Sequence, residues 1–286
     1  MKVIMVPVAD RPECRLALDQ AFRLAKTLSA NIVGYHLRPH RGERRAANDG
    51  LLSVVVEEAD LPDVGDDVFE LNRANAHRLF AAMSQEYGIA IASKPRRAEQ
   101  PLAYWNELVG TPERLFGIIG PTSDCIVVSR PRRKASGPAR AFLLAALLNA
   151  GKPLLILPQR KIPTPGGRIL VAWNQSPHAA AALSASLPLL QRAEQVHLLC
   201  CGKEELPGPK LVHARNYLAH WGIEASLHRE KGREVAREIL QVYQRNDCDL
   251  LVMGAYSHSR LRQRMLGGVT QELVSEHDLP VFALHS

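Results

Sequence analysis

The chain has 286 residues, of which 46% are hydrophobic and 23% charged, and its formal net charge is +7. This length suffices for two hydrophobic cores, and the composition is that of a globular protein. No apolar run is long enough to span a membrane, and no aromatic side chains interleave the arginines as nucleic-acid stacking requires. The five cysteines show no zinc-ligand spacing. We therefore expect a cytoplasmic protein whose partners include neither a membrane nor a nucleic acid.

Strands and helices are predicted to alternate along the first half of the chain. Residues 2–9 (KVIMVPVA) form a continuous apolar run that indicates a buried strand, and the apolar spacing between 16 and 28 indicates a helix. Further buried strands are expected at 31–37, 123–129 and 151–158. A basic run followed by an acidic run fills residues 38–70, which we interpret as a surface insertion.

The second half of the chain repeats this order. Strands are expected at 168–174, 195–201, 248–254 and 278–285, and a helix from about Pro177 to Gln191. The first strands of the two copies are offset by 165 residues and the fourth strands by 125, so the first copy is 40 residues longer between these points.

Apolar strands that alternate with helices predict a parallel sheet covered on both faces. We expect an α/β protein of two tandem doubly wound, Rossmann-like domains, each with a five-stranded, mainly parallel sheet. The domains are predicted at 1–158 and 168–286, because the segment between them, PQRKIPTPGG, is rich in proline and glycine.

In the second copy, glycines stand at both ends of the loop that follows the fourth strand, in VMGAYSHSRLRQRMLGGVTQEL (252–273). In open parallel sheets, ligands bind beyond the carboxyl ends of the strands. Gly254 would let the chain pass close to a ligand, and the helix predicted after Gly267 and Gly268 would offer free amides to a phosphate, with Thr270 as a hydroxyl donor. On spacing alone, a plain glycine turn before an ordinary helix is an equal alternative.

At these residues the sequence resembles the universal stress protein family, as a tandem two-domain member. ATP-binding members carry G-x2-G-x9-G-[ST] here, and this chain has Gly254, Ser257, Gly267 and Gly268 at those positions. The family's aspartate at the end of strand one is Asn174 in this chain. The resemblance covers 168–286 well and 1–158 mainly by strand order. It implies a nucleotide site formed by Ala172, Trp173, Asn174, Met253, Gly254, Ser257, Gly267, Gly268, Val269 and Thr270.

The first copy lacks this pattern, because Ala9 stands opposite Asn174, Ser129 stands opposite Gly254, and no glycine pair precedes its helix. We interpret it as a degenerate, structural domain.

The resemblance implies a stress-response protein that binds ATP or another adenine nucleotide, with or without Mg²⁺, as a regulatory signal. No catalytic residue set and no metal site is recognised in the sequence. Two alternatives stay open: an enzyme that hydrolyses nucleotides or transfers a nucleotidyl group, and a nucleotide-free dimeric adaptor for another protein. Asp249, at the other end of strand four, and Glu204, after strand two, are expected to be loop residues.

Overall fold

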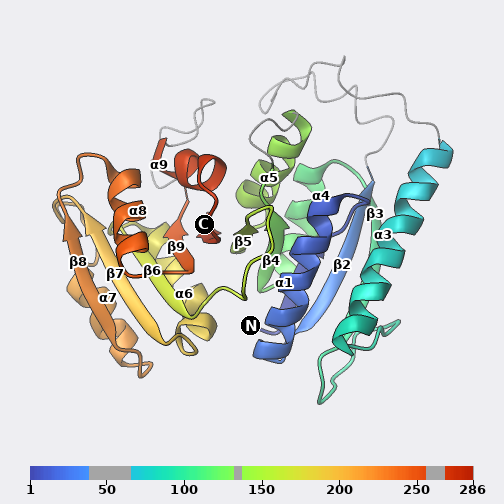
Figure 1. The fold of residues 1–286 in the computed structure, drawn as a ribbon, viewed down its shortest axis with the longest axis horizontal. Coiled ribbons are helices and arrows are strands. Elements are labelled where there is room, and N and C mark those ends of the chain that lie inside the picture. Colours follow the sequence, from blue (N-terminus) through green and yellow to red (C-terminus); the bar gives the residue numbers. More distant parts are fainter. Residues whose placement is uncertain (39–65, 132–136, 256–267, 286) are drawn as a thin grey trace. The chain divides into compact units, whose positions relative to one another are not determined.

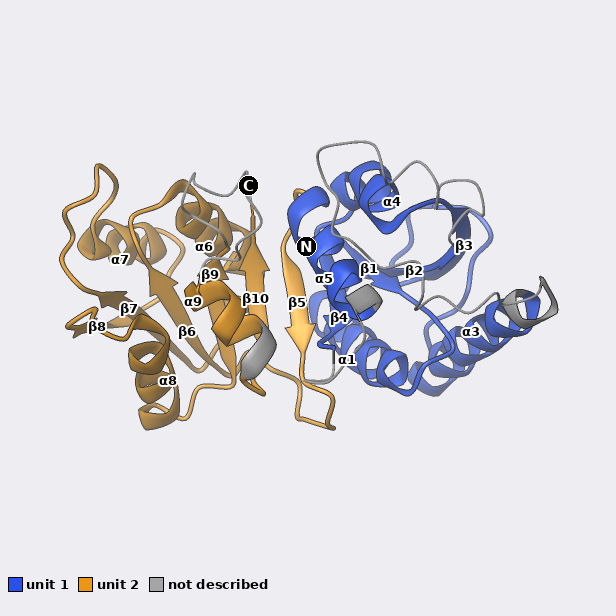
Figure 2. Cartoon of the chain, turned by 90° about the horizontal axis from the view of Figure 1, so that it is seen from above, with its two compact units in different colours: residues 1–150 blue, residues 151–286 orange. Residues whose placement is uncertain are grey.

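The structure, a computed structural model, describes residues 1–38, 66–131, 137–255 and 268–285. Its contacts divide the chain into two compact units, Met1–Ala150 and Gly151–Ser286 (Figure 2). Each unit has a central sheet flanked by helices (Figure 1).

The first unit contains four described strands in the order β3-β2-β1-β4, and their pairings are parallel. The strands are β1 (Val3–Pro7), β2 (Asn31–Arg38), β3 (Ala103–Val109) and β4 (Cys125–Ser129). The helices are α1 (Pro12–Leu28), α3 (Asp66–Tyr87), α4 (Pro112–Ile119) and α5 (Gly137–Asn149), with a short 3-10 turn at Gly120–Thr122. Most of the expected insertion at 38–70 lies outside the described residues, and its last residues begin α3.

The second unit has the described strand order β5-β10-β9-β6-β7-β8. Its strands are β5 (Leu154–Leu157), β6 (Arg168–Trp173), β7 (Gln195–Cys201), β8 (Ala225–Glu230), β9 (Leu250–Gly254) and β10 (Val281–Leu284). Its helices are α6 (Pro177–Leu190), α7 (Leu211–Ala219), α8 (Val235–Arg245) and α9 (Gly268–Gln271), which continues into a π-helical turn at Glu272–Glu276. Figure 2 shows α6 and α7 on one face of this sheet and α8 and α9 on the other.

The predicted α/β class with mainly parallel sheets is confirmed. Within the second unit, β6, β7, β8, β9 and β10 pair in parallel. The exception is β5, which pairs antiparallel with β10, for example Leu155 with Phe282. The sequence analysis placed this strand at the end of the first domain. The contacts instead divide the chain after Ala150, and β5 pairs with β10 within the second unit. The domain boundary between 158 and 168 stays a prediction.

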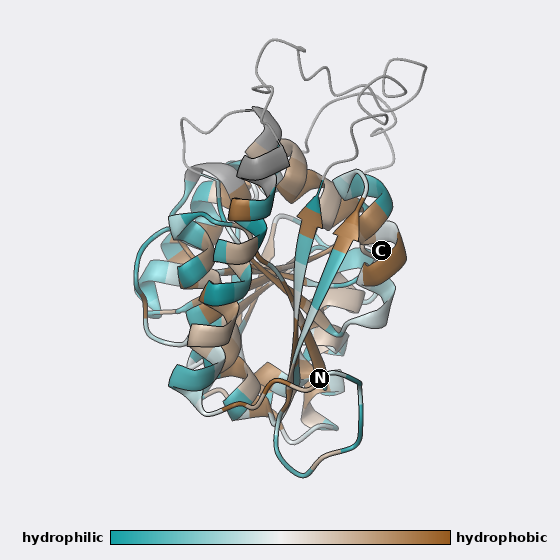
Figure 3. Cartoon of the chain, turned by 90° about the vertical axis from the view of Figure 1, so that its right-hand side faces the viewer, coloured by the Kyte–Doolittle hydropathy of each residue, from teal (hydrophilic) through white to brown (hydrophobic). Residues whose placement is uncertain are grey.

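The strands form the core of each unit because apolar residues occupy both of their faces. In β4 and β9, four consecutive residues are buried, which is typical of parallel strands covered by helices on two sides. Hydropathy colouring shows the inner strands as hydrophobic, whereas the helices carry both hydrophilic and hydrophobic residues (Figure 3). Helix α1 begins with Pro12 at its first turn and ends at Leu28, and the next residue, Ser29, caps it in a left-handed conformation with φ 49°.

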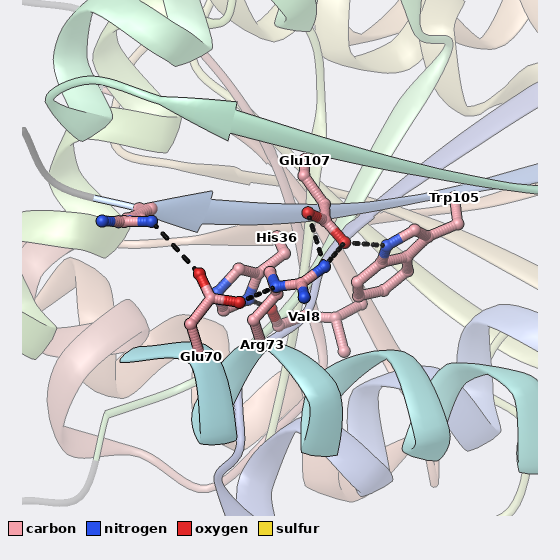
Figure 4. Close-up of polar contacts among 7 residues, drawn as sticks. Val8, His36, Glu70, Arg73, Trp105 and Glu107 are labelled. Carbon is pink, nitrogen blue, oxygen red and sulfur yellow. Dashed lines mark hydrogen bonds and ion pairs between the residues drawn. The ribbon is translucent and has the colours of Figure 1, made fainter. Parts of the chain in front are cut away.

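In the first unit, polar contacts hold α3 beside β2 and β3 (Figure 4). The Arg73 guanidinium donates to Glu70 at 2.8 Å and to Glu107 at 3.3 Å. Glu107 also accepts from Trp105 Nε1 at 2.9 Å, and Glu70 accepts from Arg38 at 3.5 Å. These charged groups are substantially exposed, so each pair adds little to stability, and the network mainly orients α3 on the sheet.

Candidate functional site

The strand order of the second unit reverses at β6. From β6 the chain proceeds to β7 and β8 on one side and later returns to β9 and β10 on the other. Ala172 of β6 pairs with Met253 of β9, so the carboxyl ends of these two strands lie level. Ligands of doubly wound sheets bind beside such a reversal, and the residues that leave β6 and β9 therefore define the candidate site.

Asn174 follows β6 directly, and it is exposed. Its Oδ1 accepts a hydrogen bond from Ser176 Oγ at 2.7 Å and another from Ser176 N at 3.3 Å. Ser176 Oγ in turn accepts from Ala179 N at 3.1 Å and caps the first turn of α6. The exposed amide of Asn174 is thus fixed at the tip of β6, at the predicted position of a nucleoside contact.

Gly254, at the end of β9, lies against the first turn of α6. A Cβ at this position would lie 2.6 Å from Ala179 N and 2.9 Å from His178 Cβ. Contacts this short do not occur between real Cβ atoms and backbone, so this helix contact already requires a glycine. The sequence attributed the glycine to the close passage of a ligand; the structure supplies another reason, and contact with a ligand stays a prediction.

Trp173 and Met253 are the residues that precede Asn174 and Gly254 at the ends of β6 and β9. Trp173 is 3% exposed and Met253 5%. Trp173 Nε1 donates to Pro209 O at 2.8 Å, which connects the end of β6 to the segment after β7. Ala172 is half-buried between β7 and β9. The indole is thus a core group with a satisfied donor, and not a freely presented ring.

At the second glycine site, Ser257 and Gly267 lie outside the described residues. The helix predicted after the glycine pair begins at Gly268, which is exposed, and a Cβ on it would meet no atom within 4 Å. Val269 is half-buried and Thr270 is 6% exposed. No described atom therefore lies close to the Cβ position of Gly268, and contact of its main chain with a phosphate stays a prediction.

Two histidines that the sequence analysis did not select lie near the end of β9. The rings of His178 and His285 stack with centroids 5.1 Å apart and an interplanar angle of 11°. His285 Nδ1 is 3.2 Å from Ala255 O, and both rings are half-buried. Burial, followed by the neighbouring His285, lowers the pKa of His178.

The two carboxylates expected in loops hold backbone in place. Glu204 accepts from Leu211 N, at the start of α7, and pairs with Arg229 at 2.5 Å. Asp249 accepts from Gly167 N at 2.9 Å, at the opposite end of the sheet from the candidate site. In the described segments, no group of three or more histidine, cysteine, aspartate or glutamate side chains could hold a metal ion. None of the described helices is both long and apolar enough to cross a bilayer.

Comparisons with known proteins agree with this architecture. Residues 202–285 match the model of the Universal stress protein family. A universal stress protein from Archaeoglobus fulgidus DSM 4304 superimposes with a TM-score of 0.72 at 16% identity, covering 99% of this chain and 97% of that one. A protein of unknown function from Pseudomonas aeruginosa PAO1 gives a TM-score of 0.58 at 14% identity, covering 99% and 92%. At these identities the structures establish the fold alone. No curated protein matches the sequence significantly.

Proposed function

We propose a stress-response function in which the second unit binds ATP or another adenine nucleotide, because residues 202–285 match the Universal stress protein family. The observation that carries this proposal is the reversal of strand order at β6, with the exposed Asn174 at the strand tip. Binding regulates the protein and involves no catalytic residue. A cytoplasmic location and homodimerisation or another protein partner are parts of the same proposal.

The chemistry of the described residues fits such a ligand. Asn174 is exposed at the tip of β6, and its side-chain amide carries N–H donors of the kind that the hydroxyl groups of a ribose accept. The backbone amide at Gly268, an exposed residue with open space at its Cβ position, suits phosphate oxygens, which accept hydrogen bonds from such donors. We assign no residue to Mg²⁺, which would accompany ATP as its counterion.

Calorimetric titration of the full chain with ATP tests the proposal. Gly268→Asp places a negative charge where the phosphate chain is expected, and the open space around Gly268 accepts the new side chain. We expect wild type and the matched control Gly268→Ala to bind, and Gly268→Asp to lose at least about tenfold in affinity. No heat with wild type at about 1 mM ATP, or equal binding by all three proteins, overturns the proposal.

An assay of phosphate and AMP release on the same samples separates binding from turnover. We expect release equal to that of a protein-free control. Release well above the control that disappears in Gly268→Asp would instead establish the hydrolase alternative.

A further inference from the structure

Strand β8 lies at the edge of the second unit and is the least buried of its described strands. Among those strands it pairs only with β7, from Ala225 opposite Val196 to Glu230 opposite Cys201 (Figure 1). No residue of β8 is fully buried, whereas four or more are buried in each of the other described strands of the unit. Elements with few buried contacts open locally at the lowest free energy, so β8 is the strand that opens first.

A pair of histidine rings joins β8 to β7. Nδ1 of His197, on β7, lies 3.0 Å from Nε2 of His228, on β8, and the ring centroids are 5.2 Å apart. At this separation one nitrogen carries a proton and donates it to the lone pair of the other. The contact between the two strands therefore depends on a single proton between these two nitrogens.

Both rings lie on the face of the sheet that α8 covers. His197 is four residues before Cys201, whose thiol is hydrogen-bonded to Glu238 of α8, and side chains at even separations share a face of a strand. His228 is likewise two residues before Glu230, which pairs with Arg245 of α8 at 3.3 Å. This places the two rings between the sheet and a helix.

The surroundings of His197 disfavour an added charge. The side chain is 6% exposed, and its second ring nitrogen, Nε2, is buried with no hydrogen-bond partner in the described part of the chain. A proton added to this nitrogen would create a buried charge without an acceptor, which costs free energy. The neutral form of the pair is therefore the one that fits the closed structure.

The charged groups that face the pair come from β6, β8 and α8. Burial lowers the pKa of His197, followed by His228 and by Arg168 of β6. Burial also lowers the pKa of His228, followed by Arg245 of α8, whereas Glu230 on β8 raises it. Two cations and one carboxylate thus face the rings, and their sum opposes protonation.

The carboxylates of these elements are held by other groups. Glu230 pairs with Arg245, and Asp247, just after α8, pairs with Arg168 at 3.4 Å. Glu238 accepts from backbone amides of the turn between β8 and α8. In the described segments, no carboxylate is hydrogen-bonded to either ring, so no anion compensates for a protonated pair.

We infer that the His197–His228 pair is a pH-sensitive switch that holds β8 on β7 at neutral pH and releases it in acid. The first added proton leaves the N–H···N contact intact. The second occupies the accepting nitrogen, so that two N–H groups and two positive charges face each other across 3.0 Å. Because β8 is the edge strand, the rings separate by an outward movement of β8, while β7 stays between its neighbours. The switch detects acidification and does not depend on a bound nucleotide.

The sign follows from the same contacts. The closed strand binds these protons less readily than the open strand, because the folded pKa values are lowered. The closed state is therefore favoured above the ordinary histidine pKa of about 6.5, and this advantage is lost as the pH falls through the folded values.

Hydrogen exchange of the ligand-free full chain tests the inference at about pH 7.5 and about pH 5, after correction for the intrinsic pH dependence of amide exchange. The Gly202 amide donates to Glu230 O at 2.9 Å and reports the pairing of β7 with β8. The amides of β9 report unfolding of the whole unit. We expect the protection of Gly202 to fall at least about tenfold in acid, and to stay at least about tenfold below that of β9 at both pH values.

His228→Gln removes one titrating ring and keeps a hydrogen-bonding group beside His197. We expect the acid-dependent fall at Gly202 to shrink to about threefold or less in this variant. The matched control is His220→Gln, an exposed histidine of the same unit, which should keep the wild-type fall. If His228→Gln instead shows low protection at both pH values, the ring is needed to hold β8, and the ring titration described next decides whether its protonation is the trigger.

Nuclear magnetic resonance of the histidine rings in the wild-type chain supplies that second measurement. We expect the ring signals of His197 and His228 to titrate over the pH range in which Gly202 loses protection. The inference is overturned by any of four results: equal protection of Gly202 and β9, no fall at Gly202 in acid, the same fall in all three proteins, or ring titration in a different pH range from that fall. No nucleotide is present in these measurements, so their outcome is independent of the proposed function.

Discussion

Asp124 and Asp249 make the same contact in the two units of the chain. Asp124 precedes β4, and its Oδ2 accepts from Val3 N, at the start of β1, at 3.0 Å. Asp249 precedes β9, and its carboxylate accepts from Gly167 N at 2.9 Å and from Arg168 N at 3.2 Å, at the start of β6. In each unit this aspartate joins the beginning of the fourth strand to the beginning of the first. The internal repeat therefore extends to individual hydrogen bonds.

Replacement of Asp249 by alanine is expected to destabilise the second unit. Its carboxylate also accepts from Gly166 N at 2.8 Å, so three backbone amides would lose a charged acceptor. Hydrogen bonds to charged groups contribute about 1.5–3 kcal/mol each, and we expect a loss of at least about 2 kcal/mol in the free energy of unfolding. Urea denaturation followed by circular dichroism measures this loss.

Asp247→Asn is the matched control, two residues away, because asparagine tolerates the left-handed backbone of Asp247 (φ 48°). The Asp247 side chain is 82% exposed and contacts Arg168 at 3.4 Å, an exposed pair of small energetic value. We expect this variant to stay within about 0.5 kcal/mol of wild type. Equal effects of the two substitutions would show that the three amide contacts of Asp249 do not stabilise the unit.

The fold was predictable because its signals are local and apolar. Runs such as RILVAWN are buried on both faces of the sheet, and the structure places β6 at Arg168–Trp173. Periodicity also identified the strand at 151–158, but it carries no information about partners. The antiparallel pairing of β5 with β10 therefore became visible only in the structure.

The candidate site was predictable only in part. Asn174 and Gly268 lie at strand and helix ends that the sequence marked, and both are exposed. The sequence analysis explained Gly254 by a ligand, whereas the structure shows it packed against α6. That contact joins residues far apart in sequence, so the sequence alone does not reveal it. The same holds for Gln175, whose side chain binds backbone about thirty residues later, a relationship that no spacing rule encodes.

Substitution of Gly254 is expected to act on stability even without a ligand. Gly254→Ala inserts a methyl group against Ala179 N and the His178 backbone, where no space exists. Overpacking of this kind typically costs about 1–3 kcal/mol. Thermal unfolding of the ligand-free chain should show a lower midpoint than wild type for Gly254→Ala. The midpoint of Gly268→Ala should equal that of wild type, because its Cβ enters open space. An unchanged midpoint for Gly254→Ala would mean that α6 does not pack as described.

The His197–His228 pair is expected to make stability depend on pH. His197 Nδ1 lies 3.0 Å from His228 Nε2, and the other ring nitrogen of His197 is buried without a hydrogen-bond partner in the described part of the chain. Burial lowers the pKa of His197, and His228 and Arg168 lower it further. Burial and Arg245 likewise lower the pKa of His228, although Glu230 acts in the opposite direction.

Because both folded pKa values are lowered, the unfolded chain binds protons first as the pH falls. The contribution of the pair to the stability of the folded chain is complete above the ordinary histidine pKa of about 6.5. It is lost as the pH falls through the pKa values of the folded state. We expect the urea midpoint to fall between about pH 7.5 and about pH 5. His228→Gln, which keeps a hydrogen-bonding partner for His197, should reduce this fall, whereas the exposed His220→Gln should not. Identical pH profiles for all three proteins would contradict the prediction.

Glu238 is expected to make stability depend on pH in a second, more acidic range. Its carboxylate accepts from Gly232 N at 2.7 Å and from Arg233 N at 3.1 Å, and thereby fixes the turn between β8 and α8. Burial on its own raises the pKa of Glu238, but these backbone donors outweigh burial, and the net pKa is lowered. A lowered carboxyl pKa stabilises the folded chain above the unfolded value of about 4.3, and this stability is lost as the pH falls through the folded pKa.

Glu238→Gln should therefore be less stable than wild type at neutral pH, and the difference should shrink below about pH 4. The matched control is Glu234→Gln in the same turn, whose side chain is 64% exposed and pairs only with Arg237 at 2.8 Å among the described ion pairs. We expect the control to follow the wild-type urea midpoint at each pH, because an exposed pair contributes little. A constant difference between Glu238→Gln and wild type across this range would show that the amide contacts do not depend on the charge of Glu238.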